Sequence, residues 1–366
     1  MEVTLEFITK MCCHGADKTK EEFRITELKA LMRITFRQLY KCTISNNANK
    51  EEDYKNNIKY IEDRLFGSTS IKSPMTLKQC YSSKQKNSYK VEICVKDKDA
   101  DLIAVYKNIL IQSSIIGAIG AKSRKGYGSF IITNIIMKIN NNNDKNNNDN
   151  TLNIYEGLKD KNVIEFISNI GLETVELIKA SIERNSINVE ENKKVRISFI
   201  DLNCEKSDTK EDEDYPYIKS IKAYKIKVKD DYESILTKIK KLTKYRCKPE
   251  FYNPIKQEND SGNLPIEINI LGNYKLKEWE GYKEDKNNKF SKKRRFACPI
   301  VVSFWKNKND KYMVIKELNY MYMLNKMYKG VNRQENDKDE YEKYILINKA
   351  YVNKYVEELR KMVGRN

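Results

Sequence analysis

The residues best suited to chemistry lie in a 14-residue stretch, 117–130, which reads GAIGAKSRKGYGSF. It holds four of the 13 glycines in the chain and three cations, with one aromatic residue, Tyr127, between the glycines. In order, these are Gly117, Gly120, Lys122, Arg124, Lys125, Gly126, Tyr127 and Gly128. Glycine tolerates backbone conformations with positive φ, and successive N–H groups in such a loop can bind an anion. The stretch therefore predicts a seat for phosphate groups, with an ordinary glycine turn as the alternative.

Two further stretches concentrate cations. Lys29, Arg33, Arg37 and Lys41 recur every four residues and, with Arg24 before them, predict a basic ridge on one helix. No acidic residue interleaves with this row in the sequence, so its mutual repulsion is explained if a phosphate backbone passes nearby. A solvated helix face is the alternative. The second stretch, 292–295, reads KKRR and contributes Lys293, Arg294 and Arg295. We expect the three stretches to form one basic groove that binds nucleic-acid phosphates.

The composition points the same way. The 366-residue chain has 69 Lys and Arg against 52 Asp and Glu, a net charge of +17 with a pI of about 9.2. Such a charge favours a polyanionic partner, although the Lys- and Asn-rich composition could produce it by genomic drift alone. No apolar run is long enough to cross a membrane, and no secretory signal opens the chain. Its eight cysteines show no CxxC spacing, so we expect reduced thiols, a cytoplasmic protein and no cofactor.

Hydrophobic periodicity predicts the elements around these stretches. Helices are expected at 26–42, 101–116, 161–182 with a break near Gly171, 232–245 and 340–363. Strands are expected at 3–7, from 75, and at 89–95, 129–139, 195–202, 217–228, 301–305 and 312–318. The first half thus follows the βαββαβ order of ferredoxin-like and RNA-recognition folds.

This order predicts an α+β protein made of two ferredoxin-like (RRM-like, βαββαβ) domains with helical insertions. The expected divisions are an N-terminal domain at 1–139, an Asn-rich linker or insertion at 140–150, and a C-terminal domain at 151–366.

The motifs resemble the RAMP superfamily of CRISPR-associated RNA-binding proteins, and within it the Cmr-one subunits of type III-B (Cmr) effector complexes. The resemblance lies in the blocks FRITELKALMRITFRQL (23–39), LFGS with SPM beyond it, IGAIGAKSRKGYGSF and RRFACPI. The family's glycine loop has the form GxGxxxxxGxG, from which Ala118 departs at the first glycine. The resemblance implies a non-catalytic subunit in antiviral defence that caps the guide-3′ end and helps capture target RNA. Its partners would be guide or target RNA and other Cmr-type subunits.

Two other functions remain open from the sequence. A related RAMP nuclease that processes guide precursors without metal would need a general base, and His14 is the single histidine of the chain. A free-standing RNA-recognition protein would need an aromatic pair on its sheet, which the sequence does not display. Metal binding by Cys12, Cys13 and His14 is not expected, because adjacent residues chelate one ion poorly and no second ligand pair follows.

Overall fold

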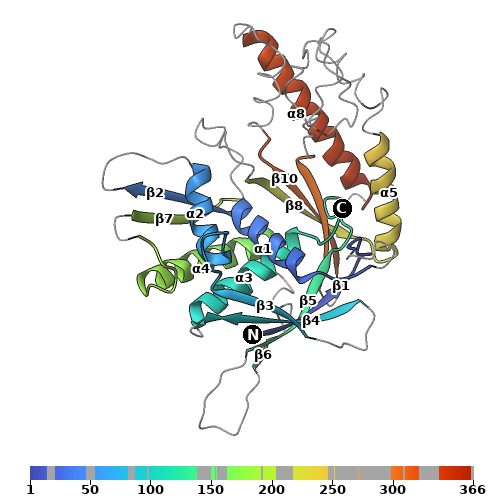
Figure 1. The fold of residues 1–366 in the computed structure, drawn as a ribbon. Coiled ribbons are helices and arrows are strands. Elements are labelled where there is room, and N and C mark those ends of the chain that lie inside the picture. The colour runs from blue at the N-terminus through green and yellow to red at the C-terminus, as the bar shows by residue number, and fades with distance from the viewer. Residues whose placement is uncertain are drawn as a thin grey trace, which may run out of the picture.

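The computed structural model shows an α+β architecture of antiparallel sheets and packed helices (Figure 1). It describes residues 1–14, 21–46, 54–80, 87–96, 99–137, 150–152, 154, 163–190, 193–202, 217–245, 251, 271, 298–307, 310–320 and 338–363. This confirms the predicted fold class.

The first half contains a five-stranded sheet in the order β3-β4-β1-β5-β6, in which all neighbours are antiparallel. The strands are β1 (Glu2–Phe7), β3 (Met75–Cys80), β4 (Ser88–Val95), β5 (Phe130–Met137) and β6 (Asn150–Leu152). Helix α1 (Ile25–Leu39) follows β1, and helix α3 (Ala100–Ile116) joins β4 to β5. Because β1 lies between β4 and β5, the order β1, α1, β3, β4, α3, β5 has the split βαβ connections of a ferredoxin-like unit.

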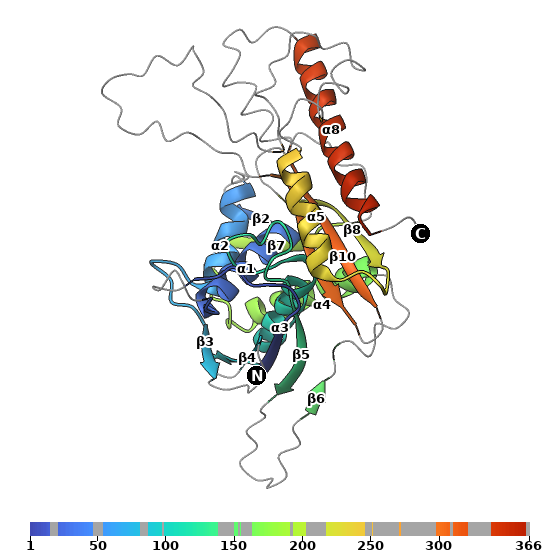
Figure 2. The same ribbon diagram turned by 90° about the vertical axis from the view of Figure 1, so that its right-hand side faces the viewer.

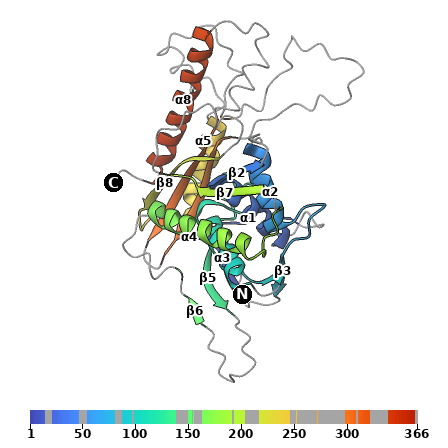
Figure 3. The same ribbon diagram turned by 90° about the vertical axis from the view of Figure 1, so that its left-hand side faces the viewer.

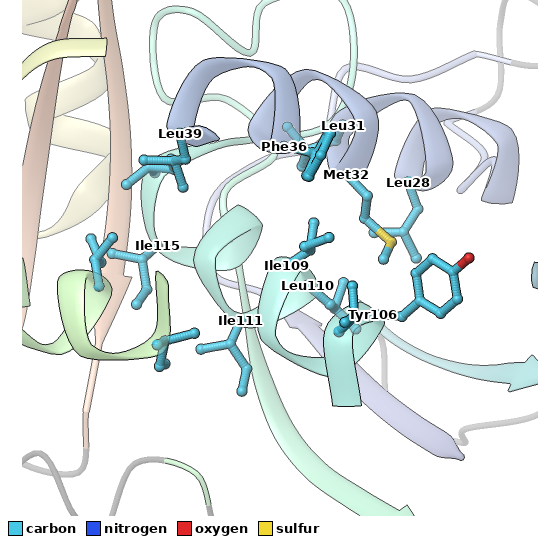
Figure 4. Packing of buried hydrophobic residues seen from close by; sticks show 14 of the residues in the cluster. Leu28, Leu31, Met32, Phe36, Leu39, Tyr106, Ile109, Leu110, Ile111 and Ile115 are labelled. Carbon is cyan, nitrogen blue, oxygen red and sulfur yellow. The ribbon is translucent and has the colours of Figure 1, made fainter. Parts of the chain in front are cut away.

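Helix α3 is the central helix of the molecule. It is apolar around most of its circumference, and the Asp99 side chain caps its start by accepting a hydrogen bond from Leu102 N at 2.9 Å. Helix α1 has apolar residues at helical spacing, and this stripe packs on α3 (Figure 4). Leu28, Leu31, Met32, Phe36 and Leu39 from α1 lie near Tyr106, Ile109, Leu110 and Ile115 from α3. Each fully buried side chain of this size contributes roughly 1.5–3 kcal/mol.

The second half contains a three-stranded sheet in the order β8-β10-β9 (Figure 2). Its elements are β8 (Ile218–Ile226), α5 (Tyr232–Tyr245), β9 (Ile300–Lys306), β10 (Lys311–Leu318) and α8 (Lys338–Lys361). Along the chain these elements follow the order βαββα. The described residues add no fourth strand to this sheet. The strand expected at 195–202 lies elsewhere. It is β7 (Lys193–Phe199), which pairs with β2 (Tyr40–Asn46) from the first half.

Three details of the expected elements were wrong. Helix α1 begins at Ile25 rather than at 26, and it ends at Leu39 rather than at 42 because the chain then extends into β2. Helix α4 (Val163–Glu183) runs through Gly171 without a break. A side chain at Gly171 would collide with the ring of Phe199, so this glycine allows α4 to approach β7.

The larger of two buried hydrophobic clusters joins the two halves. Phe36 and Ile115 from the first half belong to the same buried cluster as Ile178 and Trp305 from the second. Helix α2 (Tyr54–Phe66) packs on β2 and α4 packs on β7, so the β2–β7 pair also crosses the expected boundary (Figure 3). Residues 138–149 lie outside the described part of the chain, and the division at 140–150 stays a prediction.

Candidate nucleic-acid interface

The glycine loop, residues 117–130, lies where the two halves meet. On one side its Lys125 forms a parallel bridge with Val302 of β9, and Val302 N donates to Arg124 O at 3.0 Å. On the other side Gly120 bridges Cys12, in the segment after β1. The predicted loop between a helix and a strand is therefore confirmed, and its position gives it contacts with both sheets.

Three glycines of the loop require their residue type because their φ angles are positive. These are Gly120 at +106°, Gly126 at +87° and Gly128 at +75°. A Cβ at Gly128 would fall on the carbonyl oxygen of Ile119, and one at Gly126 would enter the ring of Phe304. The glycines thus let the loop fold closely on itself and on β9.

Much of the loop backbone is already hydrogen-bonded, and its use as an anion seat stays a prediction. Six of its N–H groups already donate to backbone carbonyls at 2.9–3.2 Å. These belong to Ile119, Ala121, Ser123, Lys125, Gly126 and Gly128. The same bonds hold the loop rigid, and Thr9 adds a hydroxyl donor to Gly126 O at 2.7 Å. The side chains of the loop are therefore the groups best placed to meet an anion.

Two loop cations point away from the protein. Lys122 and Arg124 are both exposed, and neither forms an ion pair with a described carboxylate. The ammonium of Lys122 lies 5.5 Å from the centre of the Tyr127 ring, and Arg124 Nη1 donates to Cys298 O at 2.9 Å. Lys125 and Tyr127 are half-buried. The loop therefore presents two positive charges on a rigid support.

The ridge on α1 has a different environment. Arg37 donates to both carboxylate oxygens of Glu62, at 2.5 and 2.6 Å, and Arg33 donates to Glu62 at 3.0 Å and to Asp63 at 3.3 Å. Glu62 is fully buried, and its hydrogen bond raises the pKa of the Arg37 guanidinium. The repulsion expected along the ridge is thus relieved by α2, a helix that the sequence row alone does not reveal.

The other cations of this stretch separate. Lys29 Nζ donates to Ser73 Oγ at 3.1 Å. The pKa of Lys29 is lowered, mainly by burial and to a smaller extent by repulsion from Arg33. Lys41 lies in β2, beyond the end of the helix, with its ammonium 4.9 Å from the centre of the Tyr217 ring. Arg24 is exposed at the start of α1. The predicted single row is therefore three helical positions followed by a strand position.

The third cationic stretch cannot be placed. Lys293, Arg294 and Arg295 lie outside the described residues, while the following Cys298 accepts the hydrogen bond from Arg124. The chain after this stretch therefore contacts the glycine loop. A groove formed by all three stretches remains a prediction.

Two buried charged residues were missed by the sequence reasoning. Glu62 lies between Ile58 and Leu65 on the buried side of α2, and a carboxylate within such a stripe indicates a cation nearby. Lys316 lies between Val314 and Leu318 on the buried face of β10, where its Nζ donates to Gln38 Oε1 at 2.8 Å. Burial, and then repulsion from Arg124, lowers the pKa of Lys316 to about 7.

The remaining chemical candidates form no recognisable centre in the described residues. His14 lies on the surface and bridges Glu21 through its backbone. Across the described ranges, no three His, Cys, Asp or Glu side chains come close enough to hold a metal ion. Among the helices described, none is both long and apolar enough to cross a bilayer.

Comparison with protein-family models finds no match, and comparison with curated proteins finds none. Among solved structures, the chain is similar to Cmr1 from Pyrococcus furiosus in its apo form, with 14% identity, a TM-score of 0.41 and 87% of each chain covered. It is also similar to a chain of the Type III-B Cmr-beta complex bound to cognate target RNA, with 13% identity and a TM-score of 0.46 over 98% of this chain and 99% of that one. A further structure of Cmr-beta, bound to cognate target RNA and AMPPnP in the presence of ssDNA, gives 13% identity and a TM-score of 0.47, over 96% of this chain and 99% of that one.

Proposed function

We propose that this protein is a non-catalytic RNA-binding subunit of a type III-B CRISPR ribonucleoprotein. In this role it caps the guide-3′ end of the complex and helps capture target RNA for antiviral interference. The observation that carries the proposal is the glycine loop, which presents Lys122 and Arg124 to solvent between the two halves of the molecule. The motif order of the sequence supports the family, and the net charge of +17 supports an anionic partner.

The loop suits a phosphate backbone because its cations are exposed while its main chain is fixed. A rigid support lowers the ordering cost of binding, and unpaired cations release counterions from RNA when they bind phosphate. Arg124 can bind a phosphate through two parallel hydrogen bonds, whereas Lys122 acts as a point charge. This chemistry recognises RNA through its backbone.

The decisive variant is Lys122→Glu, because the Lys122 side chain contacts the Tyr127 ring and forms no ion pair with a described carboxylate. We expect this reversal to weaken the binding of a short single-stranded RNA by about tenfold, or ~1.4 kcal/mol, with unchanged thermal stability. Fluorescence anisotropy at several salt concentrations measures it. Arg124→Glu should act in the same direction, but it also removes the hydrogen bond to Cys298.

The matched control is Lys78→Glu, which makes the same charge change on the exposed edge strand β3. Equal losses in Lys122→Glu and Lys78→Glu would mean that total charge, not the loop, governs binding. RNA affinity that survives Lys122→Glu unchanged would refute the proposed site.

The nuclease alternative rests on His14 as a metal-independent general base. Incubation of the purified protein with a labelled guide precursor, without metal, tests it. We expect no cleavage. Cleavage that disappears in His14→Ala would replace the binding function with an enzymatic one.

A further inference from the structure

A second polar surface lies on the two-stranded ribbon formed by β2 and β7. The strands pair Lys41 with Ser198, Thr43 with Arg196 and Ser45 with Lys194. Because side chains alternate between the two faces of a strand, these six residues share one face, called the ribbon face below. The register therefore combines three cations and three hydroxyl groups on one surface.

The opposite face of the ribbon is apolar and covered. Cys42, Ile44 and Ile197 are buried there, against helices α2 and α4 (Figure 3). On the ribbon face, five of the six side chains are exposed and Lys41 is half-buried. The alternation thus fixes the polar side chains outward, and they cannot turn inward without breaking the core.

Two of the ribbon-face charges, those of Lys194 and Arg196, are uncompensated within the described part of the chain. Neither Lys194 nor Arg196 forms an ion pair with a described carboxylate. Their neighbour Lys193, whose side chain is 17% exposed, does pair with Glu190 at 3.5 Å. The ribbon face therefore holds free cations in a region where a neighbouring cation is neutralised.

We propose that the ribbon face is a second contact surface for the sugar-phosphate backbone of single-stranded RNA. Side chains two positions apart on a strand are roughly 7 Å apart, so cations and hydroxyl donors repeat along the ribbon as phosphates repeat along an extended RNA strand. Arg, Lys, Ser and Thr are the side chains that commonly bind phosphate oxygens. An acidic protein partner fits less well, because protein interfaces have an apolar core and the ribbon face contains no apolar side chain.

This inference extends the proposed function by giving the same RNA a second place to bind. Helix α1 packs against the glycine loop through Leu31 and leads directly into β2, and the loop and the ribbon lie on either side of α1 in Figure 1. An RNA that contacts both surfaces must follow α1. A short RNA reaches the loop alone.

The test uses two unstructured oligouridines, one short and one several times longer, with the Lys194→Glu/Arg196→Glu variant. We expect the variant to bind the long RNA about tenfold more weakly, and the slope of log affinity against log salt to become shallower by about 1.4, which corresponds to two phosphate contacts. Binding of the short RNA should not change. The control Lys227→Glu/Lys229→Glu makes two equal reversals in the exposed turn after β8.

A milder variant, Lys194→Gln/Arg196→Gln, keeps the test valid if charge reversal disturbs the ribbon, and it should reduce the slope equally. Affinity and slope equal to wild type in either folded ribbon variant would overturn this inference, and an acidic protein would then be the better occupant. A separate measurement tests the proposed function. If Lys122→Glu binds the short RNA as tightly as wild type does, the proposed function fails, whatever the result for the ribbon variants.

Discussion

The glycine loop and the α1 arginines are both cationic, but their cations have different partners. In the loop, the backbone is hydrogen-bonded to itself and to its neighbours, while Lys122 and Arg124 extend into solvent. On α1, Arg33 and Arg37 converge on the buried carboxylate of Glu62. One region uses its backbone for structure and leaves its charges free, whereas the other uses its charges for structure.

This difference shows that a row of cations is not by itself a binding surface. Burying Glu62 without a cation would be costly, and two half-exposed guanidinium groups neutralise it while fixing α1 against α2. The arginines of α1 therefore have a structural role, and RNA binding by them stays a prediction. We expect the loop to bind RNA more strongly than α1 does, because its cations do not neutralise a buried carboxylate.

The largest expected effect comes from Gly128→Ala in the loop. A Cβ here would strike the carbonyl oxygen of Ile119, and φ at this position is +75°. We expect a loss of about 3–5 kcal/mol in the free energy of unfolding, together with weaker RNA binding, because the loop must open. Urea denaturation measures it. Gly117→Ala, at a φ of −131°, serves as the comparison: its Cβ would also crowd Leu31 and the Ser113 carbonyl oxygen, but less severely, so it should cost less. Equal losses would contradict the dominant role given to the φ and the Ile119 contact at Gly128.

The next effect tests the arginine region. Glu62→Gln leaves Arg33 and Arg37 without their shared carboxylate, and we expect a loss of about 2–3 kcal/mol, below the range for fully buried pairs because both arginines reach water. RNA affinity should not fall. The control Glu176→Gln removes an exposed pair with Lys179 and should change stability by less than about 0.5 kcal/mol. A drop in RNA affinity without a drop in stability would reverse the roles assigned to the two regions.

Local patterns were sufficient to predict most of the architecture. The period of α1, the apolar length of α3 and the alternation of β4 are visible in short windows, and these elements form near the expected positions, apart from the last turn predicted for α1. The glycine loop was also located, because positive φ and close approach restrict the residue type directly.

What failed depends on contacts between distant segments. β2 was read as the end of α1, because its partner β7 lies about 150 residues further along the chain. Glu62 is separated from Arg33 by 29 residues, so the neutralisation of the ridge could not be read from its own spacing. Likewise, six N–H groups of the loop proved to be occupied only once their carbonyl partners were placed.

Lys316 extends the comparison to a cation inside the protein, close to the loop. Its pKa is lowered from 10.5 to about 7, so between these pH values the unfolded chain binds a proton that the folded chain does not. Stability should therefore rise with pH from 7 to 9, by about 1–3 kcal/mol from this residue. Lys316→Met should remove the rise in unfolding free energy between pH 7 and 9. Its stabilisation relative to wild type should be largest at pH 7 and below. Urea denaturation at each pH measures this, with the exposed Lys222→Met as the control. Parallel pH curves for Lys316→Met and wild type would show that Lys316 is not the group responsible.

The smallest expected effect separates two arginines within one stretch. Arg24 is exposed and has no ion pair with a described residue, whereas Arg33 is paired with Glu62 and Asp63. We expect Arg24→Ala to weaken RNA binding about threefold, or ~0.7 kcal/mol, without loss of stability. Arg33→Ala should instead lower the unfolding midpoint and leave RNA affinity within error. Anisotropy and thermal melts on the same two variants measure both properties. If Arg33→Ala is instead the variant that loses RNA affinity, then a guanidinium paired with two carboxylates can still bind phosphate. Ion pairing alone would then not distinguish structural cations from RNA-binding cations in this fold.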